Sequence, residues 1–415
     1  MKKSLLLILS AITIHAITLE QAIEIGLKNS PDFLMQKNKI LLSHEALNIK
    51  KASNYGKISM RGSYTKYNIP RTLTPIVPPI TSNILTSQEI GSLGVAYDVS
   101  LFSGFSSMRD IEIASLSENI SQMALNLSRE QLIYNIRSVY LKILSLKSQE
   151  NGAISYRDAL VKLEEIVALG VEIGKRPKVD LLKVKADLES ANVGVKELRS
   201  NIEILHSSLA SIIGVDELSD IEDISTSSKA DLEDQDIKSL NRYKMSLIEE
   251  KKSDKKLQNA NSSYYPNLSL NGYYGNNYGE GESDDIWQVG VGLNWVLFDF
   301  GTRSSLVQKA KIEKLQSSLQ SKKIELTLKR DIEEAKKRVD IAADKLQSAK
   351  SELALVEETL KIEQMRYDQG VGTIYDLLFA KSRHQNTLSK EINSKYALQS
   401  AIYYYKYITE NGDTK

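Results

Sequence analysis

The chain has 415 residues, with 54 lysines and arginines against 53 aspartates and glutamates, four histidines and no cysteine. A charge balance this even excludes electrostatic binding of nucleic acid, while the length is sufficient for two domains. Without cysteine the chain has no disulfide scaffold, no thiolate metal site, no cysteine nucleophile and no N-terminal lipid-modified cysteine.

The first sixteen residues have the features of a secretory signal. Lys2 and Lys3 precede an apolar run over residues 5–14, and Ala16 ends a short segment typical of a cleavage site. We therefore expect residues 1–16 to be removed and the mature chain to begin at Ile17 without a lipid. No later stretch reaches about twenty apolar residues, so any membrane crossing must use strands.

No pattern in the chain predicts a catalytic site, a metal site or a cofactor. Besides His15 in the signal, the histidines are His44, His206 and His384, which are far apart in the sequence. Zinc-protease, nucleotide-binding and serine-hydrolase motifs are absent. The protein is therefore not expected to be an enzyme.

After the signal, the apolar period alternates between that of helices and that of strands. For the first half we expect helices over residues 19–54 with a new start at Pro31, strands over 57–67 and 92–102, helices over 106–169 and 178–213, and an acidic connector over 215–236. For the second half we expect a helix over 237–261, strands over 266–274 and 287–297, and helices over 302–368 and 373–408.

The two halves repeat one another. Leu101-Phe102 corresponds to Leu297-Phe298, and Asp180 to Asp376, at the same offset of 196 residues (297 − 101 and 376 − 180). Before the strand loops the offset is 210 residues (265 − 55). The chain therefore consists of a repeat over 17–214, the connector over 215–236 and a second repeat over 237–415.

The helix over 302–368 carries an apolar residue at every third and fourth position, which predicts a left-handed coiled coil. This seam consists of Leu328, Ile332, Ala335, Val339, Ala342, Leu346, Ala349, Leu353, Val356 and Leu360. Because alternate seam positions are alanine, neighbouring helix backbones should approach closely.

The strand over 287–297 alternates apolar and aromatic residues with glycine, asparagine and glutamine. At about 3.3 Å per residue it would extend roughly 35 Å, which is enough to cross a bilayer core when tilted. Four such strands cannot close a barrel, and an open strand edge cannot face lipid. Closure therefore requires several copies of the chain.

Three motifs resemble those of the TolC-type outer-membrane efflux proteins. They are the join Leu101-Phe102-Ser103-Gly104, the join Leu297-Phe298-Asp299-Phe300-Gly301 and the turn from Tyr367 to Leu378. With the repeat, the resemblance covers essentially the whole mature chain. It implies a mainly helical fold with a membrane β-barrel: a homotrimer in which long antiparallel helices form an α-barrel and four strands per protomer build a twelve-stranded barrel.

The resemblance also implies a function and partners. The protein would be the passive outer-membrane exit duct of a tripartite efflux or type I secretion system, extending into the periplasm and gated at its periplasmic end. Its partners would be the outer-membrane bilayer, a periplasmic adaptor protein and an inner-membrane pump or ABC exporter. The alternative is a structural or adhesive surface protein whose coiled coil spaces two surfaces without transport.

Aromatic residues near the strand ends are expected to form the interfacial girdles of a membrane barrel, rather than merely to reflect strand propensity. These residues are Tyr64, Tyr67, Tyr97, Tyr274, Trp287 and Trp295. The loops over 68–89 and 275–285 would then lie outside the cell.

The two helix–helix turns are the expected periplasmic gate, with turn glycines Gly174, Gly370 and Gly372. By resemblance, Asp180, Tyr367 and Asp376 match the family's closing network and constriction. The chain departs from the family at two positions, because the basic lock position is Gly372 and an expected acid is Phe379.

The repeat equivalent of Gly372 is Arg176, which follows Lys175. We therefore hypothesise a mirrored lock, in which Arg176 pairs with Asp376 or Asp180 and Phe379 narrows the bore. The alternative is that both aspartates are helix caps, since Thr373 and Asp376 have the spacing of a capping box.

Overall fold

The computed structural model describes residues 16–76, 84–224, 232 and 235–412 of the chain. Nearly all of the expected signal, and part of the loop between the first two strands, lie outside these residues. The chain forms two compact units, one of residues 38–124 and 242–324, and the other of residues 1–37, 125–241 and 325–415. Each unit contains segments of both sequence repeats, because the long helices of each repeat continue from one unit into the other.

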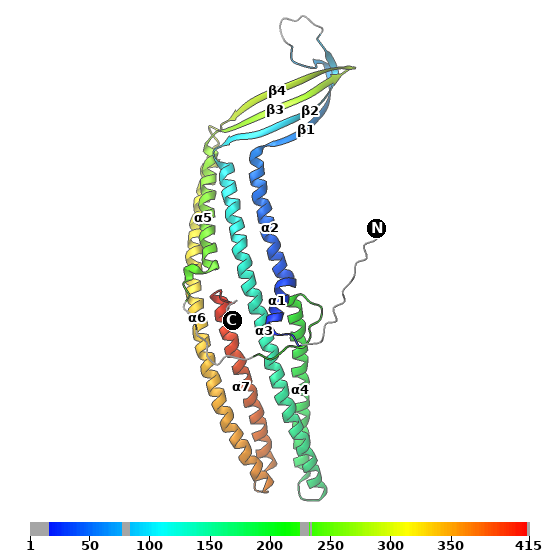
Figure 1. Ribbon diagram of the computed structural model, residues 1–415, viewed down its shortest axis with the longest axis vertical. Helices are drawn as coiled ribbons and strands as arrows, with labels where there is room; N and C mark the ends of the chain where they lie inside the picture. Colours follow the sequence, from blue (N-terminus) through cyan, green and yellow to red (C-terminus); the bar gives the residue numbers. More distant parts are fainter. Residues whose placement is uncertain (1–15, 77–83, 225–231, 233–234, 413–415) are drawn as a thin grey trace. The chain divides into compact units, whose positions relative to one another are not determined.

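The first unit contains a four-stranded antiparallel sheet with the strands in chain order (Figure 1). Its strands are β1 (Lys57–Thr72), β2 (Thr86–Ser103), β3 (Asn267–Gly279) and β4 (Glu282–Asn294). Each central strand is paired on both sides, whereas β1 and β4 are the two edges of the sheet within the chain. The expectation of a mainly helical chain with four strands is confirmed.

The second hairpin differs from expectation, because the segment predicted as a loop over 275–285 is mostly strand. Only Glu280 and Gly281 connect β3 to β4, and both have positive φ angles of 53° and 89°. Such a two-residue connection matches the twist of antiparallel strands. The asparagines and aspartates of residues 275–285 are typical of a loop in sequence, but their backbones are paired in the sheet.

Helices of equal length follow the second strand of each repeat. The helices α3 (Ser106–Glu172) and α6 (Thr302–Asp368) both contain 67 residues and begin and end at the repeat offset. Each is followed, after a short turn, by a return helix, α4 (Lys178–Ile213) or α7 (Ile374–Ile408). The predicted bounds of α4 and α6 agree with the structure to the residue.

Shorter helices precede the first strand of each repeat. They are α1 (Leu19–Asn29), α2 (Pro31–Ala52) and α5 (Asn241–Asn261), and single turns η1 (Ser53–Tyr55), η2 (Ile237–Ser239) and η3 (Ser262–Tyr264) adjoin them. Thr18 and Gln21 form a capping box that starts α1. The start of the second helix at Pro31, after Ser30, is as expected.

The connector is anchored to the second unit by its backbone. Ile17 and Ile221 form a parallel bridge, and the hydroxyl of Tyr140 lies 2.9 Å from the carbonyl oxygen of Ile17 and 2.6 Å from that of Glu222. Tyr140 is fully buried in the hydrophobic cluster that joins α1, α3, α4 and α7. The connector thus has a fixed attachment over its first residues.

The predicted seam of α6 is buried at eight of its ten positions, and Leu353 and Leu360 are half-buried. Ala335 and Ala349 have no exposed surface, and Leu328, Ile332, Val339 and Leu346 are also buried. An alanine at these positions leaves room for a neighbouring backbone, as the sequence pattern indicated. Within the described residues, no helix is both long and apolar enough to span a bilayer.

Replacing Ala349 by leucine should destabilise the protein, because the added side chain has no space in the buried seam. The expected loss is about 1–3 kcal/mol, measured as a lower melting temperature of the helical circular dichroism signal in detergent. Ser348→Leu, at an exposed neighbouring position, should leave the melting temperature nearly unchanged. Equal effects of the two substitutions would contradict a tightly packed seam.

Candidate functional site

The sheet has one apolar and one polar face. The pairing places Met60, Val95, Tyr274 and Trp287 side by side on the apolar face, because each faces the next across the ladder. Along β4, Val289, Val291 and Leu293 continue this face, and all three are exposed in the single chain. A continuous exposed apolar surface of this kind requires a partner, either lipid or protein.

The aromatic residues expected to form girdles lie on this face or at its limits. Tyr64, Tyr97, Tyr274 and Trp287 belong to the apolar face by their pairing. Trp295 follows the last residue of β4, and its Nε1 donates a hydrogen bond of 3.1 Å to the carbonyl oxygen of Tyr264. Trp295 comes eight positions after Trp287, which corresponds to about 26 Å along a strand.

Tyr67 lies where the β1–β2 register shifts, after Lys66. The Cζ atom of Arg71 lies 5.4 Å from the centre of its ring. The structure therefore places Tyr67 next to a cation at the hairpin end of β1, rather than in the regular part of the ladder. Whether any of these aromatics lines an interface stays a prediction.

The opposite face of the sheet is polar and internally hydrogen bonded. The guanidinium of Arg61 lies 2.5 Å from a carboxylate oxygen of Asp98, and the amide of Asn271 donates to the other carboxylate oxygen at 2.7 Å. Ser63 and Ser92 pair across the same two strands. This face is therefore suited to contact with water.

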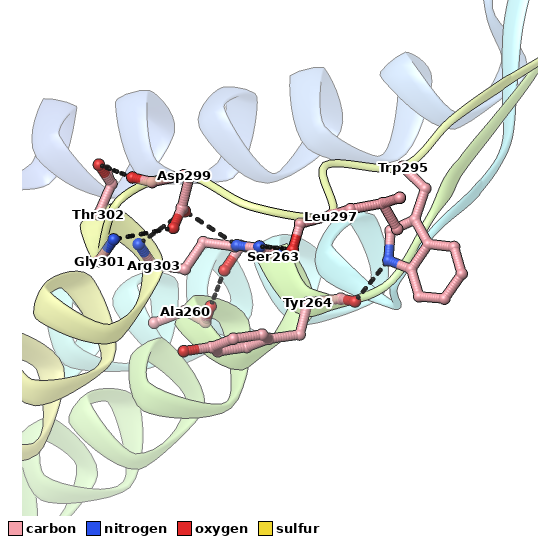
Figure 2. A network of polar contacts seen from close by, with 9 residues as sticks. All are labelled: Ala260, Ser263, Tyr264, Trp295, Leu297, Asp299, Gly301, Thr302 and Arg303. Carbon is pink, nitrogen blue, oxygen red and sulfur yellow. Dashed lines mark hydrogen bonds and ion pairs between the residues drawn. The ribbon is translucent and has the colours of Figure 1, made fainter.

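Each long helix begins almost directly after a strand, and Figure 2 shows the second of these joins. The carboxylate of Asp299 accepts hydrogen bonds from the backbone N–H groups of Gly301 and Arg303 and from Nε of Arg303. The same guanidinium donates to the carbonyl oxygen of Leu297 at 3.2 Å. The start of α6 is thus held to the end of the strand segment by one ion pair.

The first join has a neutral version of this arrangement. Ser103 and Ser107, the repeat equivalents of Asp299 and Arg303, have their hydroxyls 3.0 Å apart, and Ser107 N–H donates to the Ser103 hydroxyl. Both helices are therefore started by a side chain four residues before the group it binds.

The two helix–helix turns share one backbone conformation. In the first, the N–H groups of Lys175 and Arg176 both donate to the carbonyl oxygen of Gly170. In the second, Val371 and Gly372 donate in the same way to Arg366. Gly174 and Gly370 have positive φ angles of 72° and 76° at equivalent positions, where glycine is favoured.

Arginine and glycine exchange places between these turns. In the first turn the aliphatic part of Arg176 lies across Gly170, where an added Cβ would be 3.0 Å from Cγ of Arg176. In the second turn Arg366 stands at the position of Gly170, and a Cβ on Gly372 would meet it at 3.1 Å. An arginine side chain fills the same space in both turns. In the first turn it belongs to Arg176, at the end of the turn, and in the second turn to Arg366, at its beginning.

Arg176 also contacts the other turn. Its Cζ atom lies 4.1 Å from the ring centre of Tyr367, the next to last residue of α6, which is a favourable cation–π distance. Tyr367 is buried with residues of α3, α4 and α7, such as Leu163, Val184 and Leu377. The packing brings together Arg176 and Tyr367 of the expected gate.

The hydroxyl of Tyr367 is buried without a hydrogen-bond partner in the described chain. Burial raises the pKa of this hydroxyl, while Arg176 acts against the shift and Asp180 adds to it. An unpartnered buried hydroxyl costs free energy in this conformation.

Asp376 is a helix cap within the single chain. Its carboxylate accepts from the hydroxyl of Thr373 at 2.7 Å, and the Thr373 hydroxyl accepts from the N–H of Asp376. These hydrogen bonds to Thr373 hold the pKa of Asp376 below its usual range. Among the described residues, Arg176 has no ion pair with Asp376 or Asp180, so the pairing of the mirrored lock is not present inside one chain.

The remaining gate candidates lie on the surface. Lys175 is exposed, and Phe379 is exposed and stacks on Tyr375 with ring centres 6.4 Å apart. The sequence analysis missed Tyr375, although its spacing of four residues from Phe379 is that of helix neighbours. It also missed the pair of Gly170 and Arg366, which a comparison of the two repeats would have indicated. The gating roles of all these residues stay predictions.

Comparisons with known proteins agree with this architecture. Residues 244–402 match the family model of outer membrane efflux proteins. The matched segment comprises 159 of the 415 residues. No curated protein matches the chain.

Solved structures of outer-membrane channels match this chain over nearly its full length. The Campylobacter jejuni CmeC channel is 18% identical with a TM-score of 0.80, covering 95% of this chain and 86% of that chain. The Vibrio cholerae outer membrane protein VceC is 15% identical with a TM-score of 0.78, covering 94% and 96%. The open-state Neisseria gonorrhoeae MtrE channel is 15% identical with a TM-score of 0.74, covering 95% and 89%. At these identities the matches establish the fold.

The family consists of channel proteins rather than enzymes. Among the described residues, no group of histidine, aspartate and glutamate side chains is arranged to hold a metal ion.

Replacing Tyr367 by phenylalanine should raise the stability by about 1 kcal/mol, because it removes a buried hydroxyl without a partner. The matched control is Tyr140→Phe, which removes a buried hydroxyl that is hydrogen bonded and should lower the melting temperature. If Tyr367→Phe is as destabilising as Tyr140→Phe, the Tyr367 hydroxyl has a partner in the assembled protein.

Proposed function

We propose that this protein is the passive outer-membrane exit duct of a tripartite efflux or type I secretion system. The observation that carries the proposal is that an exposed, mainly apolar strand face is followed within seven residues by a 67-residue helix in both repeats. The match of residues 244–402 to the efflux protein family model and the fold both support a channel over an adhesive or spacer protein.

The proposed assembly is a homotrimer in the outer membrane. Its twelve strands would close a barrel, since each chain leaves the outer sides of β1 and β4 unpaired. The apolar faces would contact lipid between the two girdles of aromatic residues. The polar faces, with Arg61, Asp98 and Asn271, would line the interior of the barrel. The helices would form the periplasmic part of the duct and contact an adaptor and an inner-membrane pump or exporter.

The proposed gate is the group of helix turns that includes Arg176, Tyr367, Asp180 and Asp376. Arg176 connects the α3–α4 turn to the last turn of α6 through the Tyr367 ring. The carboxylate of Asp376 accepts a hydrogen bond from Thr373 in this conformation. Only its remaining lone pairs can therefore bind a group of a neighbouring protomer. Phe379 and Tyr375 supply the exposed apolar surface for a steric constriction.

Purification tests the assembly. The protein should fractionate with the outer membrane, migrate faster on gels without heating than after it, and have the mass of a trimer in mild detergent, because closed barrels resist cold detergent. Extraction by salt alone would exclude a barrel, and a dimer would contradict the trimeric assembly while leaving a closed sheet possible.

Arg176→Ala should raise the single-channel conductance or open probability in planar bilayers, because it removes the contact between the two turns. A loss of about 1 kcal/mol would change the open population roughly fivefold. Asp376→Asn should act in the same direction, whereas Lys183→Ala, at an exposed position of α4, should behave as wild type. If both gate variants match wild type, Arg176 and Asp376 have only structural roles.

A further inference from the structure

The start of the mature chain predicted from the sequence coincides with the first anchored residue of the fold. Ala16 is exposed and lies outside the helices and strands, whereas Ile17 forms the parallel bridge with Ile221 of the connector. The N–H of Ile17 donates to the carbonyl oxygen of Asp220 at 2.7 Å, and its carbonyl oxygen accepts from the N–H of Glu222 at 3.0 Å. The peptide bond between Ala16 and Ile17 is therefore the boundary between an exposed residue and an anchored one.

The nitrogen atom of Ile17 has a fixed position in the second unit. The Ile17 side chain is partly buried and packs against the hydrophobic cluster that joins α1, α3, α4 and α7. The hydroxyl of Tyr140, in the same cluster, lies 2.9 Å from the Ile17 carbonyl oxygen. The next residue, Thr18, is the N-cap of α1 and forms its capping box with Gln21. The side chain, the bridge and the following helix thus hold the Ile17 backbone together.

Acidic side chains surround this backbone. Residues 215–224 of the connector include five carboxylates and no lysine or arginine. Burial raises the pKa of the Tyr140 hydroxyl, and a hydrogen bond to the backbone of Glu222 opposes this shift. The negative charges of Glu222, Glu20 and Asp223 raise the pKa further. Because the hydroxyl lies next to the Ile17 carbonyl oxygen, the same three carboxylates act on the nitrogen of that residue.

The nearby cationic side chains are occupied by one carboxylate of the connector. Lys147 forms an ion pair with Asp220, and Nε2 of His206 lies 3.9 Å from the same carboxylate. Within the described ranges, no lysine or arginine side chain pairs with Glu20 or Glu222. A positive charge on the Ile17 nitrogen would therefore face these two carboxylates without competition from a cationic side chain.

We propose that cleavage between Ala16 and Ile17 turns the Ile17 nitrogen into a structural cation, which holds the acidic connector beside the start of α1. The α-ammonium group keeps the hydrogen bond to the Asp220 carbonyl oxygen. It also gains two N–H donors and one positive charge near the carboxylates of Glu20 and Glu222. Removal of the signal thereby completes the attachment of the connector. This inference does not depend on the transport function proposed above.

The cleavage is a hydrolysis by a secretory signal peptidase. The bond between the carbonyl carbon of Ala16 and the nitrogen of Ile17 breaks, and water adds its hydroxyl group to the carbon and a proton to the nitrogen. At neutral pH the new amine takes up a second proton from solvent, since an α-amino group ordinarily has a pKa of about 7.7–8.0. The new carboxyl group of Ala16 loses its proton and leaves with the released segment.

The helix that follows opposes a cation at this position, but more weakly than the acids favour it. The N-terminus of a helix is equivalent to about half a positive elementary charge. Three carboxylates act at this point, and Lys147 is balanced by Asp220. The first N–H groups of α1 are also bonded within its capping box, and Glu20 lies in its first turn. The net potential at Ile17 is therefore negative.

Displacing the ammonium group tests the proposal. A glutamine and a threonine inserted between Ala16 and Ile17 leave a mature chain that is two residues longer, so the charge moves by about 7 Å along the chain. The N–H of Ile17, now part of a peptide bond, can still donate to the Asp220 carbonyl oxygen. N-terminal sequencing first establishes the start of both mature forms. If the unaltered protein does not begin at Ile17, the proposal is overturned.

The readout is the rate at which a protease cuts the connector of the purified native protein, because this rate reports local opening. At pH 7 the lengthened form should be cut about two- to fivefold faster, which is the range for a partly exposed charge interaction. At about pH 10 the amine is neutral in both forms, so their rates should agree. Equal rates at pH 7 overturn the proposal. A difference that persists at pH 10 is steric and overturns the role of the charge.

Neutral variants of the acids provide a matched comparison. In Glu20→Gln/Glu222→Gln the insertion should have at most half of its effect on the cutting rate, because the ammonium group has lost two of its carboxylates. The control is Asp216→Asn/Glu217→Gln, which changes the net charge equally at two exposed connector positions and should leave the effect of the insertion unchanged. If both double variants reduce the effect equally, the contact with Glu20 and Glu222 is wrong.

Acetylation of the α-amino group provides a test without an added residue. Selective acetylation of the unaltered protein removes the charge at Ile17. It should increase the cutting rate at pH 7 by the same two- to fivefold. An unchanged rate after acetylation overturns the proposal, even if the insertion itself unfolds the protein.

Discussion

Unpaired backbone groups at the edges of the sheet are the constraint on which the rest of the architecture depends. A strand edge in lipid must be paired, because no water is available there to satisfy its N–H and C=O groups. The chain pairs β1 through β4 within itself and leaves one edge at each end. In the proposed assembly, the need to close the sheet therefore brings the copies together.

The joins between strand and helix transmit this constraint to the helices. Asp299 with Arg303 and Ser103 with Ser107 fix the first turn of α6 and α3 to the residues that end the strands. A helix that begins so close to a strand has little freedom in direction. Phe105 at the first join and Phe300 at the second have positive φ angles of 68° and 54°, so the chain accepts local backbone strain to make this connection.

The two repeats conserve backbone geometry more closely than side-chain identity. The helix turns have the same hydrogen bonds, yet the arginine that fills each turn comes from Arg176 in one and from Arg366 in the other. A basic residue is therefore present at each turn, but only Arg176 lies on Tyr367. The exchange makes the two turns similar in shape and different in charge distribution.

Much of this fold could be predicted from the sequence, because helical and strand periods are local signals. The bounds of α4 and α6 follow from their apolar spacing, and the Thr373–Asp376 cap follows from residue types three apart. The strand character of residues 275–279 and 282–285 could not be predicted, since it depends on pairing between β3 and β4 rather than on propensity. The contact of Arg176 with Tyr367 joins residues far apart in the chain, so only tertiary packing reveals it.

The unequal hairpins have a consequence for the symmetry of the proposed trimer. The connection from β1 to β2 spans residues 73–85, whereas Glu280 and Gly281 alone connect β3 to β4. Around a closed barrel, three long connections would alternate with three minimal ones, so the pseudo-sixfold arrangement of the strands becomes threefold at its outer rim. Any large particle that approaches from that side would meet three equivalent positions, although the wall beneath them is built from six similar hairpins.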